Sequence, residues 1–323
     1  MKRIAVLTSG GDAPGMNAAI RAVTRGALAR GWEVLGVTNG YAGLLAGIFS
    51  PLTARDVGGI VQKGGTVLGS ARSPEFATPQ GRGKAVGELK ERGVEALVVI
   101  GGNGSQTGAA SLDEAGFPVI GVASTIDNDV YGTDVSIGAD TAVNITLEAI
   151  DRLRTTASSH QRAFLVETMG RDCGHIALMA GIAGGAEVIS IPESDITPEQ
   201  MAERLSDSYR RGKTHAIAVV AEGARCGIRE MMEHYGKHKD SIGFELRVTR
   251  LGHVVRGGAP SAADRVLATR IGADAVELMA AARFGVLAGI VKGEPAATPL
   301  AEVAGRTRPA DVRLLELARV MAL

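Results

Sequence analysis

The chain has 323 residues, and its 35 basic and 35 acidic side chains give a formal net charge of zero at pH 7. This balance argues against a nucleic-acid-binding surface, because proteins bind phosphate backbones through a net basic footprint. Hydrophobic residues make up 45% of the chain, which excludes general disorder. The first apolar stretch is too short for a signal peptide, and no run reaches the roughly 18 apolar residues of a membrane span. We therefore expect a soluble, cytoplasmic protein of one or two domains.

Short apolar, β-branched runs alternate with helical patterns along the chain. Predicted helices cover residues 16–29 and 107–115, and predicted strands cover 4–7, 33–37, 95–100, 119–122, 163–166, 188–191 and 215–220. Thr197-Pro198-Glu199-Gln200 predicts a further helix, because it is a capping box with proline at the first helical position. Buried strands that alternate with helices indicate an α/β fold whose mostly parallel sheet is covered on both faces.

Glycine is the compositional outlier, with 44 residues, about twice the usual frequency of roughly 7%. Several glycine clusters directly follow predicted strands, among them Gly10-Gly11 and Gly101-Gly102. In parallel α/β sheets, ligands bind beyond the carboxyl ends of the strands. The glycine clusters therefore mark the expected functional edge of the sheet.

Two of these clusters have the character of phosphate cradles. Gly10 to Gly15 connects the first predicted strand to a helix, and Gly101-Gly102-Asn103-Gly104-Ser105 follows the strand over 95–100. Backbone N–H groups at a helix N-terminus bind phosphate well, but each segment is also compatible with a plain βα turn. Neither matches G-x-G-x-x-G or the P-loop, so a dinucleotide-dependent oxidoreductase, the rival class, is disfavoured.

Two carboxylates follow the next predicted strand, at Asp127 and Asp129. In an extended segment, alternate side chains point to the same side. Two acids at a strand end suit the deprotonation of a hydroxyl and the organisation of Mg²⁺. The alternative is a solvated turn rich in Asp and Asn.

Basic side chains recur beside glycines and strand ends, at Arg162, Arg171, Arg247, His253 and Arg256. Each by itself is compatible with a surface charge, but arginine forks recognise phosphate in a bidentate manner. As a set they indicate a second anionic ligand. The residues alone thus predict an enzyme that joins a nucleotide polyphosphate to a second anionic substrate.

Across essentially its whole length the chain resembles the bacterial 6-phosphofructokinase family. The resemblance rests on ordered segments that include LTSGGDAPGMNAAIR, ALVVIGGNGS, STIDND, VETMGRDCGH and LGHVVRGGAPSAADRVLA. It implies two similar α/β domains, with a nucleotide-binding domain at 1–138 plus 252–305. The fructose 6-phosphate-binding domain is expected at 139–251 plus 306–323. The resemblance also implies a homotetramer with active sites at subunit interfaces.

The resemblance further implies the glycolytic transfer of the ATP γ-phosphoryl, with Mg²⁺, to the 1-hydroxyl of fructose 6-phosphate. Asp127 matches the general base. The other catalytic matches are Thr125, Arg171 and Gly11. The expected nucleotide contacts are Gly11, Tyr41, Arg72, Gly102, Asn103, Gly104, Ser105 and Gly108. The expected sugar-phosphate contacts are Thr125, Asp127, Asp129, Arg162, Met169, Gly170, Arg171, Glu222, Arg247, His253 and Arg256, with Arg162 and Arg247 from the neighbouring subunit.

The chain departs from the family pattern around the phosphoryl donor. Asn103 stands where the family has the aspartate that holds Mg²⁺, so Asn103 and Asp129 are the candidate metal residues. Ser124 and Ser73 replace a glycine and an aromatic residue. The pyrophosphate-using branch has aspartate at position 104 and lysine at position 124, and this chain has neither. An alternative therefore stays open: a paralogue with an altered donor, or with little catalysis and a regulatory role.

The resemblance also implies an allosteric pocket for ADP or phosphoenolpyruvate. Arg21 and Arg25 share one face of the first predicted helix. The matching residues are Arg21, Arg25, Arg154, Gly185, Glu187, Lys213 and His215, whereas Ala54, Gly59 and Thr214 replace charged family residues. The loss of two cationic groups predicts weaker effector binding.

Overall fold

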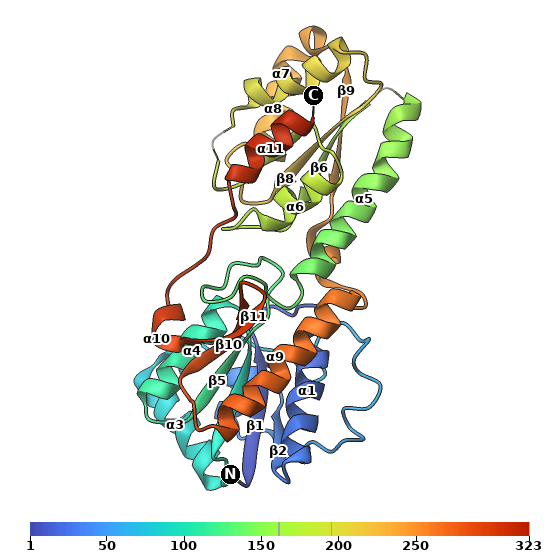
Figure 1. Ribbon diagram of the computed structural model, residues 1–323. Coiled ribbons are helices and arrows are strands. Elements are labelled where there is room, and N and C mark those ends of the chain that lie inside the picture. The colour runs from blue at the N-terminus through green and yellow to red at the C-terminus, as the bar shows by residue number, and fades with distance from the viewer. Residues whose placement is uncertain (161, 195, 323) are drawn as a thin grey trace. The chain divides into compact units, whose positions relative to one another are not determined.

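The computed structural model describes residues 1–160, 162–194 and 196–322, and it divides into two compact units. Unit 1 comprises Met1–Asp140 and Arg256–Arg308, and unit 2 comprises Thr141–Val255 and Pro309–Leu323. The chain therefore crosses between the units three times, as in the division expected from the sequence, and each crossing lies two to four residues further along. The secondary structure of both units is drawn in Figure 1.

Unit 1 is built on a mixed seven-stranded sheet in the order β11-β10-β5-β4-β1-β2-β3. The five central strands are parallel, and the edge strands β3 and β11 are antiparallel to their neighbours. The strands are β1 Arg3–Ser9, β2 Glu33–Val37, β3 Phe49–Pro51, β4 Ala96–Gly101, β5 Val119–Ala123, β10 Val286–Val291 and β11 Glu294–Pro299. The helices of this unit are α1 Met16–Ala29, α2 Gly40–Leu45, α3 Pro79–Glu91, α4 Asn103–Glu114, α9 Ala262–Ala280 and α10 Leu300–Val303, with a 3₁₀ turn at Glu75–Ala77.

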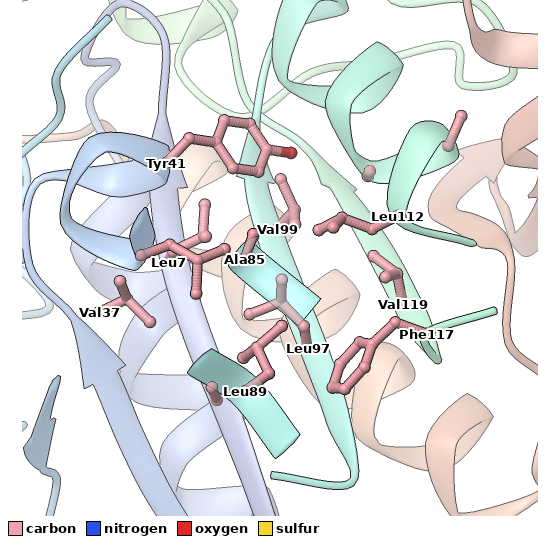
Figure 2. Close-up of a cluster of buried hydrophobic side chains, with 14 of the residues drawn as sticks. Leu7, Val37, Tyr41, Ala85, Leu89, Leu97, Val99, Leu112, Phe117 and Val119 are labelled. Carbon is pink, nitrogen blue, oxygen red and sulfur yellow. The ribbon is translucent and has the colours of Figure 1, made fainter. Parts of the chain in front are cut away.

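Both faces of this sheet are buried, which explains the continuous apolar runs in its strands. Alternate residues of β1 and β4, such as Leu7, Leu97 and Val99, enter one core cluster together with side chains from α2, α3, α4 and α10. Figure 2 shows part of this cluster. The intervening strand residues, which are also buried, face the opposite side of the sheet. There α1 and α9 pack against each other and against the strands.

Unit 2 is built on a parallel sheet in the order β7-β8-β6-β9. Its strands are β6 Arg162–Thr168, β7 Val188–Ser190, β8 Ala216–Ala221 and β9 Glu245–Arg250. Its helices are α5 Ala139–His160, which begins at the end of unit 1, α6 His175–Ala183, α7 Pro198–Arg210, α8 Ile228–Ile242 and α11 Arg313–Met321. Alternate residues of β6 and β8 again divide between two cores, one with α5, α6 and α11 and the other with α7 and α8.

The predicted strands and the capped helix are present within a few residues of their expected bounds. In the capping box, the Thr197 hydroxyl accepts from the Gln200 N–H, and the Gln200 side chain accepts from the Thr197 N–H. The bounds of one helix were wrong, because α4 begins at Asn103 rather than at residue 107. The Asn103–Gln106 segment is thus the first turn of a helix and not a loop. Within the described part of the chain, no helix is long and apolar enough to span a membrane.

Candidate active site

Strand order in unit 1 places a crevice between β1 and β4. β1 leads into α1 on one face of the sheet, whereas the neighbouring β4 leads into α4 on the other face. Ligands of open α/β sheets bind where connections from adjacent strands diverge in this way. Ser9, at the end of β1, pairs with Gly101 at the end of β4. The two glycine clusters therefore flank a single crevice at the carboxyl edge, as the sequence predicted.

Close backbone contacts explain why glycines line this crevice. A Cβ atom on Gly101 would lie 2.5 Å from the Ser9 carbonyl oxygen, and one on Gly11 would lie 2.4 Å from Nη1 of Arg256. The same Arg256 nitrogen donates to the Asp12 carbonyl oxygen at 3.1 Å. Arg256 therefore packs against the first glycine loop, within unit 1. These contacts leave exposed backbone and a guanidinium at the mouth of the crevice, which suits an anion.

The first turn of α4 carries polar groups that lack partners. Gly102, the residue before α4, makes no side-chain cap, and the first turn has no acidic residue. Ser105 is 3% exposed, and its Oγ has no hydrogen-bond partner among the described residues. Free N–H groups and a buried hydroxyl at a helix N-terminus are donors that a phosphate group would satisfy.

The buried Tyr41 side chain supports the first turn of α4 from the core side. Its ring is 6% exposed and stacks on Phe76 with the ring centroids 3.9 Å apart. The phenol hydroxyl donates to the Ser105 carbonyl oxygen at 2.7 Å, and burial raises the pKa of Tyr41. A Cβ on Gly108 would lie 2.8 Å from the phenol ring. Tyr41, predicted to contact the nucleotide, thus lies in the core beneath the cradle, and Gly108 provides the space for its ring.

The loop after β3 is tied to the same edge of the sheet. Asn17 on α1 donates to the carbonyl oxygens of Lys63 and Gly64 and accepts from the Val67 N–H. The Ser70 hydroxyl donates to the Gly10 carbonyl oxygen at 2.6 Å. These bonds hold the segment before Arg72 beside the first glycine loop. The exposed Arg72 side chain therefore follows directly on a segment that is anchored to the first glycine loop.

The segment that carries the two candidate acids has a different conformation from the one predicted. Asn128, between Asp127 and Asp129, has φ of 53°, so the segment is a turn and the extended-strand argument for the two acids was wrong. The Asn128 side chain holds the turn by donating to the Asp134 carbonyl oxygen and accepting from the Ser136 N–H. The turn still follows β5, next to β4. A Cβ on Gly102 would lie 3.4 Å from Cβ of Thr125, so this turn contacts the second glycine loop.

Two residues that depart from the family pattern form hydrogen bonds with backbone groups of the protein. The Ser124 side chain is fully buried, and its hydroxyl donates to the Ile137 carbonyl oxygen at 3.3 Å. The Ser73 hydroxyl accepts from the Phe76 N–H at 3.3 Å, at the start of the 3₁₀ turn. Both hydroxyls thus serve the local backbone.

The candidate metal residues Asn103 and Asp129 are in direct contact. The Asn103 amide donates to the Asp129 carboxylate at 2.7 Å, while Oδ1 of Asn103 is buried and has no partner among the described residues. The described residues contain no cluster of three or more His, Cys, Asp or Glu side chains that could hold a metal ion. One carboxylate and one amide oxygen fit Mg²⁺, which keeps several waters and takes further oxygens from a bound phosphate.

The sequence-based prediction missed Gln106, which stabilises the cradle. Its buried amide donates to the carbonyl oxygens of Gly101 and Val122, at 2.9 and 3.1 Å. A side chain at Gly121 would clash, because a Cβ there would lie 2.1 Å from the Gln106 amide oxygen. A glycine inside an otherwise apolar strand was the available signal.

Unit 2 has a second crevice of the same kind, between β6 and β8. The connection after β6 leads to α6 on one face of the sheet, and the connection after β8 leads to α8 on the other. Met169, Gly170 and Arg171 follow β6 directly, and Glu222 follows β8. The Gly223 N–H donates to the Gly170 carbonyl oxygen at 3.1 Å, which brings the two loops into contact. Four of the predicted sugar-site residues therefore meet at this crevice.

Three other predicted sugar-site residues of unit 2 lie elsewhere. Arg162 is the first residue of β6, and Arg247 lies on the neighbouring strand β9, where it pairs with Phe164. Both guanidinium groups contact the carboxylate of Glu245, whose pKa they lower. The seven residues of β6, at about 3.3 Å each, separate Arg162 from the crevice by about 20 Å. His253 is exposed in the 3₁₀ helix Gly252–Arg256 that follows β9.

The predicted effector residues of unit 2 form one contact network. Lys213 donates to Glu187 at 3.1 Å, and the second oxygen of Glu187 accepts from the Ile217 N–H. The Arg154 guanidinium donates to the carbonyl oxygens of Gly184 and Gly185. His215 hydrogen bonds through Nδ1 to the Ser158 hydroxyl at 2.8 Å, and its burial lowers its pKa. Arg21 and Arg25 lie on α1 of unit 1.

Comparisons with known proteins fit this architecture. A phosphofructokinase family model matches residues 3–279. The chain is 54% identical to an ATP-dependent 6-phosphofructokinase of Thermus thermophilus and 48% identical to one of Bacillus subtilis, over the full length of both partners in each pair. A phosphofructokinase structure from Pichia pastoris shares 39% identity at a TM-score of 0.88, and the match covers 94% of this chain and 35% of that longer chain. A pyrophosphate-dependent phosphofructokinase from Marinobacter aquaeolei, at 22% identity and a TM-score of 0.85, shares the fold.

The chain therefore belongs to the phosphofructokinase family, and its α/β fold is the fold of that family.

Proposed function

We propose that the chain is an enzyme that transfers the γ-phosphoryl group of ATP to the 1-hydroxyl of fructose 6-phosphate, a glycolytic reaction of the cytoplasm. The observation that carries the proposal is the meeting of three loops at one sheet edge. The glycine loops after β1 and β4 contact each other, and the Thr125–Asp129 turn contacts the second of them. Relatives that are 48% and 54% identical along their whole length bear the name ATP-dependent 6-phosphofructokinase.

In this proposal Asp127 takes the proton of the sugar hydroxyl as that oxygen attacks the γ-phosphorus. Asp127 is half-buried, and its own N–H donates to Oγ1 of Thr125 at 3.2 Å, which stabilises the turn. The backbone of Gly11 and the guanidinium of Arg171 stabilise charge on the transferring group. Phosphoryl transfer needs little covalent chemistry from a protein, so positioning and charge stabilisation provide most of the catalysis.

The nucleotide is proposed to lie along the α4 edge, with its phosphates at Gly11 and at Gly102 to Ser105 and the rest near Arg72 and Gly108. Asn103 and Asp129 are the residues that would hold Mg²⁺ bound to the nucleotide. The metal supplies charge neutralisation on the β- and γ-phosphates. Tyr41 acts indirectly, because it fixes the first turn of α4 through the Ser105 carbonyl oxygen.

The sugar phosphate is proposed to contact the β6–β8 crevice of unit 2 through Met169, Gly170, Arg171 and Glu222, together with His253 and Arg256. Arg162 and Arg247 lie at the opposite end of β6 from this crevice. The sheet of one chain therefore does not bring Arg162 and Arg247 to the crevice of that same chain. We propose that they serve the site of a neighbouring subunit, within a homotetramer.

A donor screen tests the reaction. Fructose 6-phosphate is offered with ATP, GTP, ADP or pyrophosphate at several Mg²⁺ concentrations, and fructose 1,6-bisphosphate is measured. ATP should support the highest rate. Fructose 6-phosphate binding without turnover on any donor would contradict the proposal and favour a regulatory paralogue.

Mixing two inactive variants tests the shared site. Arg162→Ala and Asp127→Asn proteins are each expected to be nearly inactive. If they are unfolded together and refolded, some sites of the hybrids contain both wild-type residues and should regain activity. Proteins refolded separately and then mixed serve as the control. The absence of any recovery in hybrids of confirmed mixed composition would place Arg162 in its own chain's site.

The residues around Glu187, together with Arg21 and Arg25, are proposed to bind ADP or phosphoenolpyruvate. Lys213 donates to Glu187 and to the Ala322 carbonyl oxygen. An anionic effector has to compete with these contacts, which adds to the expected weakness of binding.

A further inference from the structure

The contact between Asn103 and Asp129 joins the first turn of α4 to the turn after β5. Nδ2 of Asn103 lies 2.7 Å from Oδ2 of Asp129 and 3.4 Å from its carbonyl oxygen. The same carbonyl oxygen accepts from the Arg308 N–H at 2.8 Å. Asp129 is therefore held at its carboxylate by the Asn103 amide and at its backbone by the Arg308 N–H.

The chemistry of the pair fixes the orientation of the amide. An ionised carboxylate only accepts hydrogen bonds, so the NH₂ end of Asn103 has to face it. Oδ1 then points away from Asp129, where it is buried without a partner among the described residues. A buried acceptor without a donor is unfavourable. A water molecule bound to a metal ion is a strong donor of the kind that Oδ1 lacks.

We propose that Asn103 is a positioning residue that holds Asp129 in place without a bound cation, so that the pocket binds free divalent metal weakly and receives its metal already attached to the nucleotide. Oδ1 of Asn103 then accepts a hydrogen bond from a water molecule of the incoming metal–nucleotide complex. The inference rests on the proposed function, which makes a metal–nucleotide the donor, and it identifies Asn103 as the residue that sets the metal dependence of that site.

A carboxylate at position 103 would reverse this behaviour. Two carboxylates at hydrogen-bond distance repel each other, and a divalent cation between them relieves the repulsion. Since Mg²⁺ is usually anchored by only one or two carboxylates, a second one doubles the protein's share of the anionic ligands. The Asn103→Asp pocket should therefore bind metal before any nucleotide arrives.

The test is a titration with Mn²⁺ alone, followed by electron paramagnetic resonance, in the absence of nucleotide and sugar. The wild-type chain should show no Mn²⁺ site tighter than roughly 1 mM, since a single carboxylate anchors the cation weakly. Asn103→Asp should gain one site per chain with an affinity at least about tenfold higher. Gln80→Glu, which adds a negative charge at an exposed position on α3 of the same unit, should behave as the wild type.

The exchange variant Asn103→Asp/Asp129→Asn tests whether the hydrogen-bonded pair is responsible. It restores a pair of one amide and one carboxylate, with the amide now at position 129 and the carboxylate at position 103. Mn²⁺ binding should therefore fall back to the wild-type level. Circular dichroism establishes that the variants are folded. If Asn103→Asp does not fold, the exchange variant and the wild type still decide, because either one binding Mn²⁺ tightly without nucleotide overturns the proposal.

Equal Mn²⁺ binding by wild type and Asn103→Asp would also overturn it. A second measurement, the affinity for ATP with Mg²⁺ or with EDTA, should show a larger Mg²⁺ dependence in Asn103→Asp than in the wild type. No step of this test uses phosphoryl transfer. A failed donor screen therefore contradicts the proposed function, whereas a failed Mn²⁺ titration contradicts only the role of Asn103.

Discussion

The two units place their candidate sites by the same topological rule but complete them to different extents. In unit 1 the loops after β1, β4 and β5 touch one another at a single crevice. In unit 2 the loops after β6 and β8 meet in the same way, but Arg162 and Arg247 lie at the amino end of the sheet. A parallel sheet gathers ligand-binding loops at one edge only. Residues at the opposite edge therefore lie away from the loops of the crevice, and under the proposed function the unit 2 site takes such residues from a neighbouring subunit.

The largest effect is expected from Asp127→Asn, which removes the proposed base from the crevice of unit 1. General-base catalysis contributes roughly 10²- to 10⁴-fold, so turnover should fall by that order. Fructose 6-phosphate binding, measured by calorimetry, should persist, because the crevice of unit 2 is unchanged. Steady-state rates above half the wild-type value would exclude Asp127 as the base and leave the turn after β5 without its assigned role.

Glycine substitutions test how rigidly the loops of each crevice are packed. A Cβ on Gly223 would lie 1.8 Å from the Arg171 carbonyl oxygen, and backbone cannot move aside cheaply. Gly223→Ala should reduce the free energy of unfolding by roughly 3 kcal/mol, in the upper range for single substitutions. Gly11→Ala should cost less, because its nearest neighbour is the end of the Arg256 side chain. Urea denaturation, followed by far-ultraviolet circular dichroism, measures the free energy of unfolding of both variants.

Gly83→Ala is the control for these two variants. Gly83 lies inside α3, and nothing lies within 4 Å of an added Cβ. Alanine in a helix interior is more favourable than glycine by roughly 0.5–1 kcal/mol. This variant should therefore be slightly more stable than the wild type. A Gly223→Ala protein as stable as the control would show that the two loops of unit 2 are not tightly packed.

Ser124→Gly addresses a departure from the family pattern within unit 1. The buried Ser124 hydroxyl donates to the Ile137 carbonyl oxygen, so we expect it to make no contact with the phosphoryl donor. Its loss should cost about 1 kcal/mol for the hydrogen bond, and the ratio of rates with ATP and GTP should stay the same. A changed donor preference, with stability unaffected, would mean that the hydroxyl reaches the donor after all.

The smallest effect concerns His215 in unit 2. Burial lowers the pKa of His215 below its ordinary value of 6.5, so the unfolded chain binds more protons than the folded chain around that pH. Stability therefore falls as the pH drops below about 6.5. His215→Gln should lose this component, which amounts to a difference of about one or two degrees in Tm between pH 7.5 and pH 5.5. Identical pH dependence of Tm in both proteins would show that His215 ionises equally in the folded and unfolded states.

Local sequence predicted helices α1, α4 and α7 and strands β1, β2, β4, β5, β6, β7 and β8, whereas the other helices and the buried strand β10 were not predicted. The helix at Pro198 follows from Thr197 and Gln200, because these side chains cap the backbone groups next to them. Glycine clusters after apolar runs located the crevices, because the strand–loop–helix unit is contiguous in the chain. Strand β9, Glu245–Arg250, was not predicted. Only two of its residues, Leu246 and Val248, are apolar, and its pairing partner β6 lies far away in sequence.

Tertiary structure alone decided the finer geometry of the sites. The hairpin of β10 and β11 turns through Lys292 and Gly293, both with positive φ, and its antiparallel register depends on the sheet it joins. The turn at Asn128 likewise depends on a hydrogen bond from the Ser136 N–H. The contact of Asn103 with Asp129 joins residues 26 positions apart in the chain. Sequence specifies which groups are available at the carboxyl edge, because it sets the order of strands and loops. Which of those groups touch is decided by packing between strands, since hydrogen bonds across the sheet have no local signature.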